Sequence, residues 1–144
     1  MVHRILIVCV GNICRSPTAE VMLRDRLRGK DTLVESAGLA ALVGQPIDPM
    51  AESVLAQKGL TAVDHIARQL SQAMLSEADV VMAMDNRHVS AIQALAPQAR
   101  GKTFLLGRWQ ADRPIPDPYG RDVTAFERTF GMIEDAVDAW RTRL

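Results

Sequence analysis

Short runs typical of strands alternate with longer amphipathic stretches along this chain. The strand-like runs cover residues 5–10, 32–36, 79–84 and 103–106, and the run at 79–84 is too apolar for an edge strand. Helical periodicity predicts helices over 17–28, from Pro49 to just before Gly59, and over 72–78, 86–95 and 123–143. The last helix presents one apolar stripe, predicted to be core: Phe126, Phe130, Ile133, Val137 and Trp140.

Strands that alternate with helices predict an α/β fold, with a parallel sheet and helices on both faces. We find no linker or internal repeat, so residues 1–144 are expected to form one domain. Ligands of such sheets bind beyond the carboxyl ends of the strands. The loops that contain Cys9, Gly38 and Asp117 each follow a strand end, and we expect them to share one rim.

Composition removes several classes of function. The formal net charge is zero, so nothing indicates a nucleic acid or an anionic membrane as partner. No segment approaches the ~18 apolar residues of a membrane span, and the apolar run near the N-terminus is too short for an export signal. The two cysteines lie in one loop, which argues against a secreted disulfide framework and favours a reducing cytoplasm.

The loop after the first strand, Cys9-Val10-Gly11-Asn12-Ile13-Cys14-Arg15-Ser16-Pro17, carries the strongest chemical signal. Gly11 and Asn12 tolerate the positive φ of a tight curl. Ser16 and Pro17 are typical of a helix start, so backbone N–H groups and the helix dipole would converge on one anion site. The fork of Arg15 matches two phosphate oxygens. Neither a nucleotide P-loop nor a dinucleotide fingerprint is present.

Cys9 is the predicted nucleophile of this loop. A lone cysteine at a strand end is more often an inert buried residue. Here a helix start and a guanidinium follow it, and a thiol in such surroundings ionises more readily than a free one. The loop therefore predicts a thiolate and an anion cradle together, with Val10, Gly11, Asn12, Ile13, Cys14 and Ser16 around the anion.

Asp117 is the predicted general acid. Attack on a phosphoryl group needs a leaving group that departs protonated, and a positioned acid accelerates that step about 10²–10⁴-fold. Pro116 and Pro118 restrict the backbone around Asp117, although an isolated Asp-Pro is more often a plain turn. Three other aspartates fit helix caps or exposed loops better: Asp85, Asp112 and Asp122.

The stretch from Cys9 to Glu20 resembles the signature of the low-molecular-weight protein tyrosine phosphatases. Further matches are Glu35-Ser36-Ala37-Gly38, Asp48-Pro49, His65-Ile66-Ala67-Arg68-Gln69, Met84-Asp85 and Pro116-Asp117-Pro118-Tyr119. The stretch 38–46 resembles the bacterial branch associated with exopolysaccharide export. The resemblance implies a three-layer sandwich with strand order 2-1-3-4, a phosphocysteine intermediate, and no cofactor or metal.

The same resemblance implies supporting roles. Ser16 would donate to Cys9, and Asn12, Ser36 and His65 would be joined by hydrogen bonds beneath the loop, although a lone histidine is more often a core residue. Tyr119 would stack on the phosphotyrosine ring, with Gly120 where a second tyrosine often follows. Leu39 and Leu42 would then form an aliphatic second wall. Cys14 is either filler of the loop or the partner of Cys9 in a reversible disulfide, and both interpretations stay open.

The implied partner is a phosphotyrosine protein, either an autophosphorylated bacterial tyrosine kinase or another exopolysaccharide enzyme, and we expect a monomer. Two other functions fit the residues less well. An arsenate reductase relays a disulfide through cysteines outside the loop, and this chain has none there. A non-catalytic phosphotyrosine-binding module would not need a nucleophile, a cation and an acid together.

Overall fold

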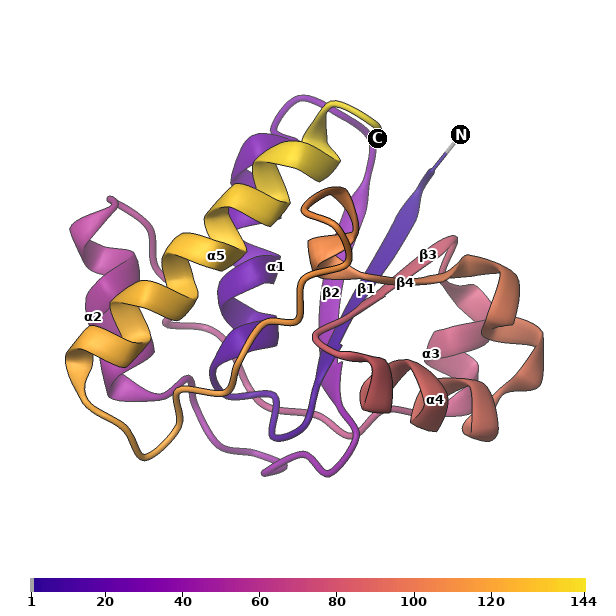
Figure 1. The fold of residues 1–144 in the computed structure, drawn as a ribbon, viewed down its shortest axis with the longest axis horizontal. Helices are drawn as coiled ribbons and strands as arrows, with labels where there is room; N and C mark the ends of the chain where they lie inside the picture. The colour runs from indigo at the N-terminus through magenta and orange to yellow at the C-terminus, as the bar shows by residue number, and fades with distance from the viewer. Residues whose placement is uncertain (1) are drawn as a thin grey trace.

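One parallel sheet organises the molecule, which a computed structural model describes over residues 2–144. Its strands are β1 (Arg4–Cys9), β2 (Leu33–Gly38), β3 (Val80–Ala83) and β4 (Thr103–Leu105), in the order β2-β1-β3-β4 (Figure 1). Strand β1 lies between β2 and β3, with Val8 opposite both Ala37 and Ala83. The predicted α/β fold class and strand order are confirmed.

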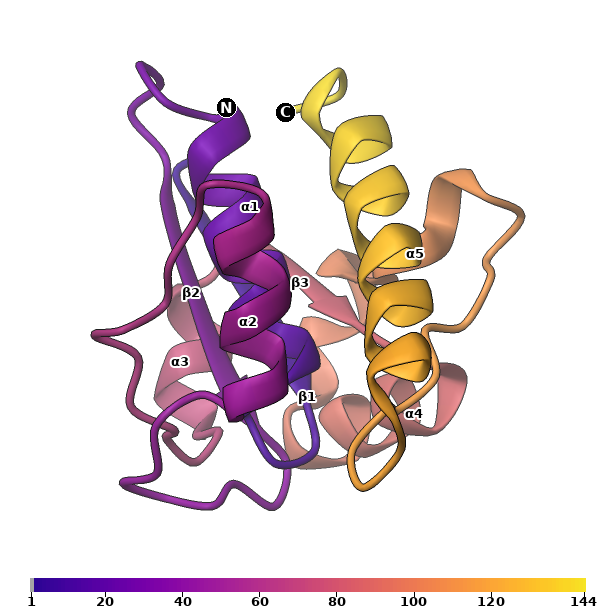
Figure 2. The same ribbon diagram turned by 90° about the vertical axis from the view of Figure 1, so that its left-hand side faces the viewer.

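Helices cover both faces of the sheet. α1 (Arg15–Arg26), α2 (Pro49–Gln57) and α5 (Val123–Arg141) pack on one face and lie in front in Figure 2, whereas α3 (Gln72–Glu77) and α4 (Asn86–Leu95) pack on the other. Side chains of a strand alternate between faces. In β1, Ile7 and Cys9 therefore join the core beneath α1 and α5, while Val8 joins the core beneath α3 and α4.

The predicted stripe of the last helix is confirmed, since Phe126, Phe130, Ile133, Val137 and Trp140 are all buried. The Trp140 indole N–H also donates to the Leu106 carbonyl at 2.8 Å. Two 3₁₀ helices at Pro97–Lys102 and Leu106–Trp109 were not expected. Such short i→i+3 segments leave no apolar periodicity to detect. Within residues 2–144, no helix combines the length and apolar character needed to cross a bilayer.

The predicted start of the first helix is wrong by two residues. α1 begins at Arg15 after Cys14, and no side chain caps it. Ser16 and Pro17 thus lie inside the first turn, where a proline is tolerated because the first N–H groups have no partner in the helix. The hydroxyl of Ser16 is consequently available to the loop before the helix. Asp85 accepts a backbone N–H at the start of α4, as predicted for a helix cap, and Asp48 and Ser71 do the same for α2 and α3.

Candidate active site

The loop between β1 and α1 is held from outside by its carbonyl groups. Five consecutive carbonyls each accept a hydrogen bond: Cys9 from Leu39 N, Val10 from Ala40 N, Gly11 from Leu42 N, Asn12 from His65 Nε2 and Ile13 from Asp48 N, at 2.6–3.0 Å. The C=O and N–H of a trans peptide point in opposite directions. The N–H groups that follow these carbonyls are therefore turned toward the concave side of the loop.

A cavity of about 210 Å³ opens on that concave side. Its lining comes from three loops: Cys9, Val10, Gly11, Asn12, Ile13, Cys14 and Arg15 from the first, Ala40 and Leu42 from the second, and Asp117 and Tyr119 from the third. These loops gather at the lower edge of Figure 1, beyond the carboxyl ends of the strands. The expected common rim is thereby confirmed.

The second loop presents Ala40 and Leu42 to the cavity rather than Leu39 and Leu42. Leu39 follows directly after β2 and packs against the core beneath α3 and α4. Side chains alternate near a strand end, so the neighbour of Leu39 is the residue that faces the cavity. Leu42, 46% exposed, and Tyr119, 57% exposed, form the apolar mouth.

Cys9 lies at the base of this cavity, with its sulfur 2.9 Å from the hydroxyl oxygen of Ser16. The same hydroxyl oxygen accepts a hydrogen bond from Asn12 Nδ2 at 2.8 Å. The Ser16 oxygen accepts the hydrogen bond from Asn12, so the hydrogen of the Ser16 hydroxyl is free to point at the Cys9 sulfur. That arrangement places a hydroxyl donor within hydrogen-bond distance of the sulfur of the candidate nucleophile.

Asn12 is fully buried and adopts a left-handed conformation, with φ of 58°. For a residue with a side chain this conformation costs about 1–2 kcal/mol. Its amide nitrogen donates to Ser36 Oγ at 3.0 Å as well as to Ser16, and its Oδ1 accepts the Arg68 backbone N–H at 2.9 Å. These contacts fix the curl of the loop. His65 takes part through the Asn12 carbonyl, so its Nε2 must carry the proton.

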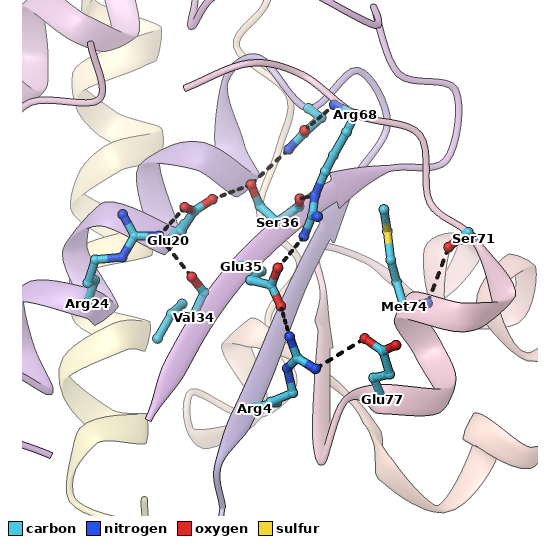
Figure 3. A network of polar contacts seen from close by, with 11 residues as sticks. Arg4, Glu20, Arg24, Val34, Glu35, Ser36, Arg68, Ser71, Met74 and Glu77 are labelled. Carbon is cyan, nitrogen blue, oxygen red and sulfur yellow. Dashed lines mark hydrogen bonds and ion pairs between the residues drawn. The ribbon is translucent and has the colours of Figure 1, made fainter. Parts of the chain in front are cut away.

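Glu20 and Arg68 also belong to this network, although the sequence analysis assigns them no role (Figure 3). Ser36 donates to the carboxylate of Glu20, which in turn accepts from Arg24. Arg68 donates its Nε to the Ser36 carbonyl and pairs with Glu35, both at 2.9 Å. Glu20 lies one helical turn after Ser16, a spacing that could have indicated it. Arg68 contacts Asn12 through its backbone, which no side-chain pattern reveals.

Arg15 is 4% exposed and joins the first loop to the third. Its guanidinium donates to the Ile115 carbonyl at 3.0 Å and lies 3.7 Å from Asp117 Oδ2. Ile115 is buried and donates its N–H to the Met84 carbonyl at the end of β3. The other carboxylate oxygen of Asp117 accepts the Tyr119 N–H at 3.0 Å. A buried cation needs such partners, and one of them is a carboxylate that a ligand can replace.

Cys14 differs from Cys9 in its surroundings. Burial, followed by the nearby Cys9, Asp48 and Asp117, raises the pKa of the Cys14 thiol far above its ordinary value. This thiol is therefore neutral, and both cysteines are free in the structure. Among residues 2–144, no group of three or more His, Cys, Asp or Glu side chains is arranged to hold a metal ion.

The chain is similar along its whole length to known phosphatases. The family described as Low molecular weight phosphotyrosine protein phosphatase matches residues 4–144. The low molecular weight protein-tyrosine-phosphatase Etp of Escherichia coli K12 is 44% identical over 142 residues, which cover 99% of this chain and 95% of Etp.

Solved structures agree with this assignment. Vibrio vulnificus Wzb in complex with benzylphosphonate superposes with a TM-score of 0.96 at 40% identity, with full coverage of both chains. The YwlE arginine phosphatase from Geobacillus stearothermophilus superposes with a TM-score of 0.92 at 33% identity, over 98% of this chain and 92% of YwlE. The chain therefore belongs to the low-molecular-weight protein tyrosine phosphatases, as an enzyme of their bacterial, exopolysaccharide-associated branch.

Proposed function

We propose that this protein hydrolyses phosphotyrosine in proteins through a phosphocysteine intermediate. The observation that carries the proposal is the meeting of Cys9, Arg15 and Asp117 around one cavity of about 210 Å³. In this mechanism the phosphate oxygens bind the inward-facing N–H groups and Arg15. The Cys9 thiolate attacks phosphorus, the P–O bond to tyrosine breaks, and the phenolic oxygen leaves with the proton of Asp117.

The second step regenerates the enzyme. Water attacks the phosphorus of the phosphocysteine and gives one proton to Asp117, now acting as base. The S–P bond breaks, and the products are the Cys9 thiolate and inorganic phosphate. Asp117 suits both steps because its side chain is 52% exposed and reaches the mouth, where a leaving group and then a water can approach.

The contact with Arg15 links substrate binding to the availability of the Asp117 carboxyl group. Without a ligand, the carboxylate lies 3.7 Å from this guanidinium. A bound phosphate dianion takes its place as the partner of Arg15 and repels a second negative charge nearby. Asp117 is then released from its contact with Arg15 and can act as the acid of the first step.

The walls of the cavity favour an aromatic phosphate ester. Val10, Ile13, Leu42 and Tyr119 offer apolar surface to a phenyl ring. A phosphorylated arginine would instead bring several N–H donors, and Asp117 is the one carboxylate in the lining described here. We therefore propose tyrosine rather than arginine as the phosphorylated residue, despite the similarity to YwlE.

We further propose an autophosphorylated bacterial tyrosine kinase, or another exopolysaccharide enzyme, as the physiological partner. The support is the similarity to Wzb, Etp and EpsP proteins over the full chain. A cytoplasmic location and a monomeric state belong to the same proposal. Free Cys9 and Cys14 in one loop suit a reducing compartment.

Hydrolysis of p-nitrophenyl phosphate with EDTA present tests the mechanism in the wild type, Cys9→Ser and Asp117→Asn. We expect metal-independent turnover that vanadate inhibits, no turnover in Cys9→Ser, and at least about a tenfold loss in Asp117→Asn. Activity that survives in Cys9→Ser would overturn the phosphocysteine. A wild type without turnover would favour a binding module. A parallel assay should give a higher kcat/KM for a phosphotyrosine peptide than for its phosphoarginine counterpart.

A further inference from the structure

A second groove of about 610 Å³ adjoins the phosphate cavity on the other side of Asp117. It shares Val10, Arg15 and Asp117 with the cavity. Three further segments complete its walls: Asp85, Arg87 and His88 at the start of α4, Pro114, Ile115 and Pro116 in the proline-rich loop that contains Asp117, and Met132 of α5. The mechanism above uses none of these last seven side chains. Because the two share Val10, Arg15 and Asp117, the groove borders the phosphate cavity directly.

Arg87 carries the available charge of this groove. Its side chain is 90% exposed, and its contact with Asp85 at 3.3 Å is an exposed pair of the kind that contributes little and exchanges readily. Asp85 is already engaged, because its carboxylate accepts the N–H groups of Arg87 and His88 at the start of α4. Arg15 is directed to the phosphate and Asp117 carries a proton in the first step. An anion in the groove would therefore meet Arg87 as the guanidinium that is held only by this exposed pair with Asp85.

His88 contributes a buried imidazole to the wall of the groove. It lines the groove but is only 5% exposed, and its Nδ1 is buried without a hydrogen-bond partner among the described residues. Buried polar atoms in folded proteins nearly always have a partner. Pro114, Pro116 and Met132 beside it offer apolar surface to the aliphatic part of a side chain.

We propose that this groove binds an anionic side chain next to the phosphotyrosine of the substrate, and that Arg87 selects it. The inference rests on the proposed function and names its substrate class more narrowly. Successive residues of an extended chain lie about 3.3–3.6 Å apart, and the groove borders the cavity at Asp117, so the residues next to the phosphotyrosine are the ones that can reach it. The anion can be a carboxylate or a second phosphotyrosine, which share the charge that Arg87 recognises.

Three phosphotyrosine peptides test the inference, with glutamate, glutamine or a second phosphotyrosine on both sides of the phosphorylated residue. In the wild type we expect kcat/KM for the glutamate peptide to exceed that for the glutamine peptide about two- to fivefold, as for an exposed ion pair. This ratio should approach one in Arg87→Gln, fall below one in Arg87→Glu, and shrink at high salt. If kcat/KM relative to the glutamine peptide is larger for the peptide with a second phosphotyrosine than for the glutamate peptide, phosphate is the better anion.

Arg100→Gln is the matched control, since Arg100 is exposed and lies before β4, at the opposite end of the sheet from the groove. This variant should keep the wild-type ratios. Equal rates for all three peptides, or a preference that survives in Arg87→Gln, would overturn the inference. Turnover of p-nitrophenyl phosphate separates the two proposals, because its presence in the wild type keeps the proposed function even if the peptide preference is absent.

Discussion

The two loops that form the site differ in how they are held. In the loop after β1, five consecutive carbonyls have donors and Asn12 and Ser16 are fully buried. In the proline-rich loop, Ile115 is the buried anchor, while the side chains of Asp117 and Tyr119 are more than half exposed. Charge stabilisation needs fixed dipoles, whereas an acid must meet both a leaving group and a water. Substitutions should therefore affect stability and catalysis together in the first loop, and catalysis alone in the proline-rich loop.

The largest effect is expected from Asn12→Ala. It removes hydrogen bonds to Ser16, Ser36 and the Arg68 N–H, and it leaves an alanine with positive φ. Each lost bond and the backbone conformation contribute about 1 kcal/mol, so urea unfolding should show a loss of about 3–5 kcal/mol. Turnover should fall about 100-fold or more because the N–H groups no longer converge.

Asn12→Gly separates the two causes of that loss. Glycine lacks the same side chain but adopts positive φ freely, so this variant should be about 1 kcal/mol more stable than Asn12→Ala. If Asn12→Ala unfolds at the wild-type urea concentration, the hydrogen-bond network does not hold the loop, and the contrast between the two loops disappears.

Gly38→Ala should have the next largest effect. A Cβ on Gly38 would lie 2.4 Å from the Val10 carbonyl oxygen, which is backbone and cannot rotate away. Relief requires a shift of the first loop, with an expected loss of about 1–3 kcal/mol in unfolding free energy and reduced kcat. Gly101→Ala is the control, because nothing lies within 4 Å of its Cβ, and it should change stability by less than about 0.5 kcal/mol. Equal midpoints for both variants would contradict the close approach.

The first loop is also the part of the site that the sequence predicted best. Its function depends on local properties of single residues, such as the tolerance of Asn12 for positive φ and the fork of Arg15. Asp117 could be proposed because the chemistry requires an acid and two prolines flank it. The start of α1 was misplaced because a proline fits the third helical position as well as the first.

Contacts between distant segments could not be predicted from local patterns. Arg68 supports Asn12 with a backbone N–H from 56 residues away. Nearly every residue has such a group, so the residue type gives no sign of this contact. The sequence analysis puts Leu39 at the mouth. The direction of a side chain just after a strand depends on the residue at which the strand ends, and the sequence does not fix that residue. Arg87 and His88 border the groove only because α4 lies beside the proline-rich loop, a consequence of the tertiary fold.

Tyr119→Ala tests the proline-rich loop, with a smaller expected effect. The ring is 57% exposed, so the urea midpoint should stay close to that of the wild type. Loss of stacking on the phosphotyrosine ring removes about 0.5–1.5 kcal/mol, a two- to tenfold fall in kcat/KM for a phosphotyrosine peptide. Tyr119→Phe keeps the ring and should retain the wild-type value. A large loss of stability in Tyr119→Ala would show that this loop is as firmly held as the first.

The smallest effect concerns His88, which lies between the two loops. Burial lowers the pKa of His88 below its ordinary value; Asp85 and Asp117 oppose this shift, whereas Arg15 and Arg87 add to it. As the pH falls below about 6.5, the unfolded chain binds a proton at this histidine before the folded chain does. The free energy of unfolding should therefore be highest above that pH and decrease with acidification until the folded histidine also titrates. Urea unfolding at several pH values between 7.5 and 5.5 measures this slope, and His88→Asn should make it shallower whatever the variant's absolute stability. An unchanged slope in His88→Asn would mean that groups other than His88 produce the acid sensitivity.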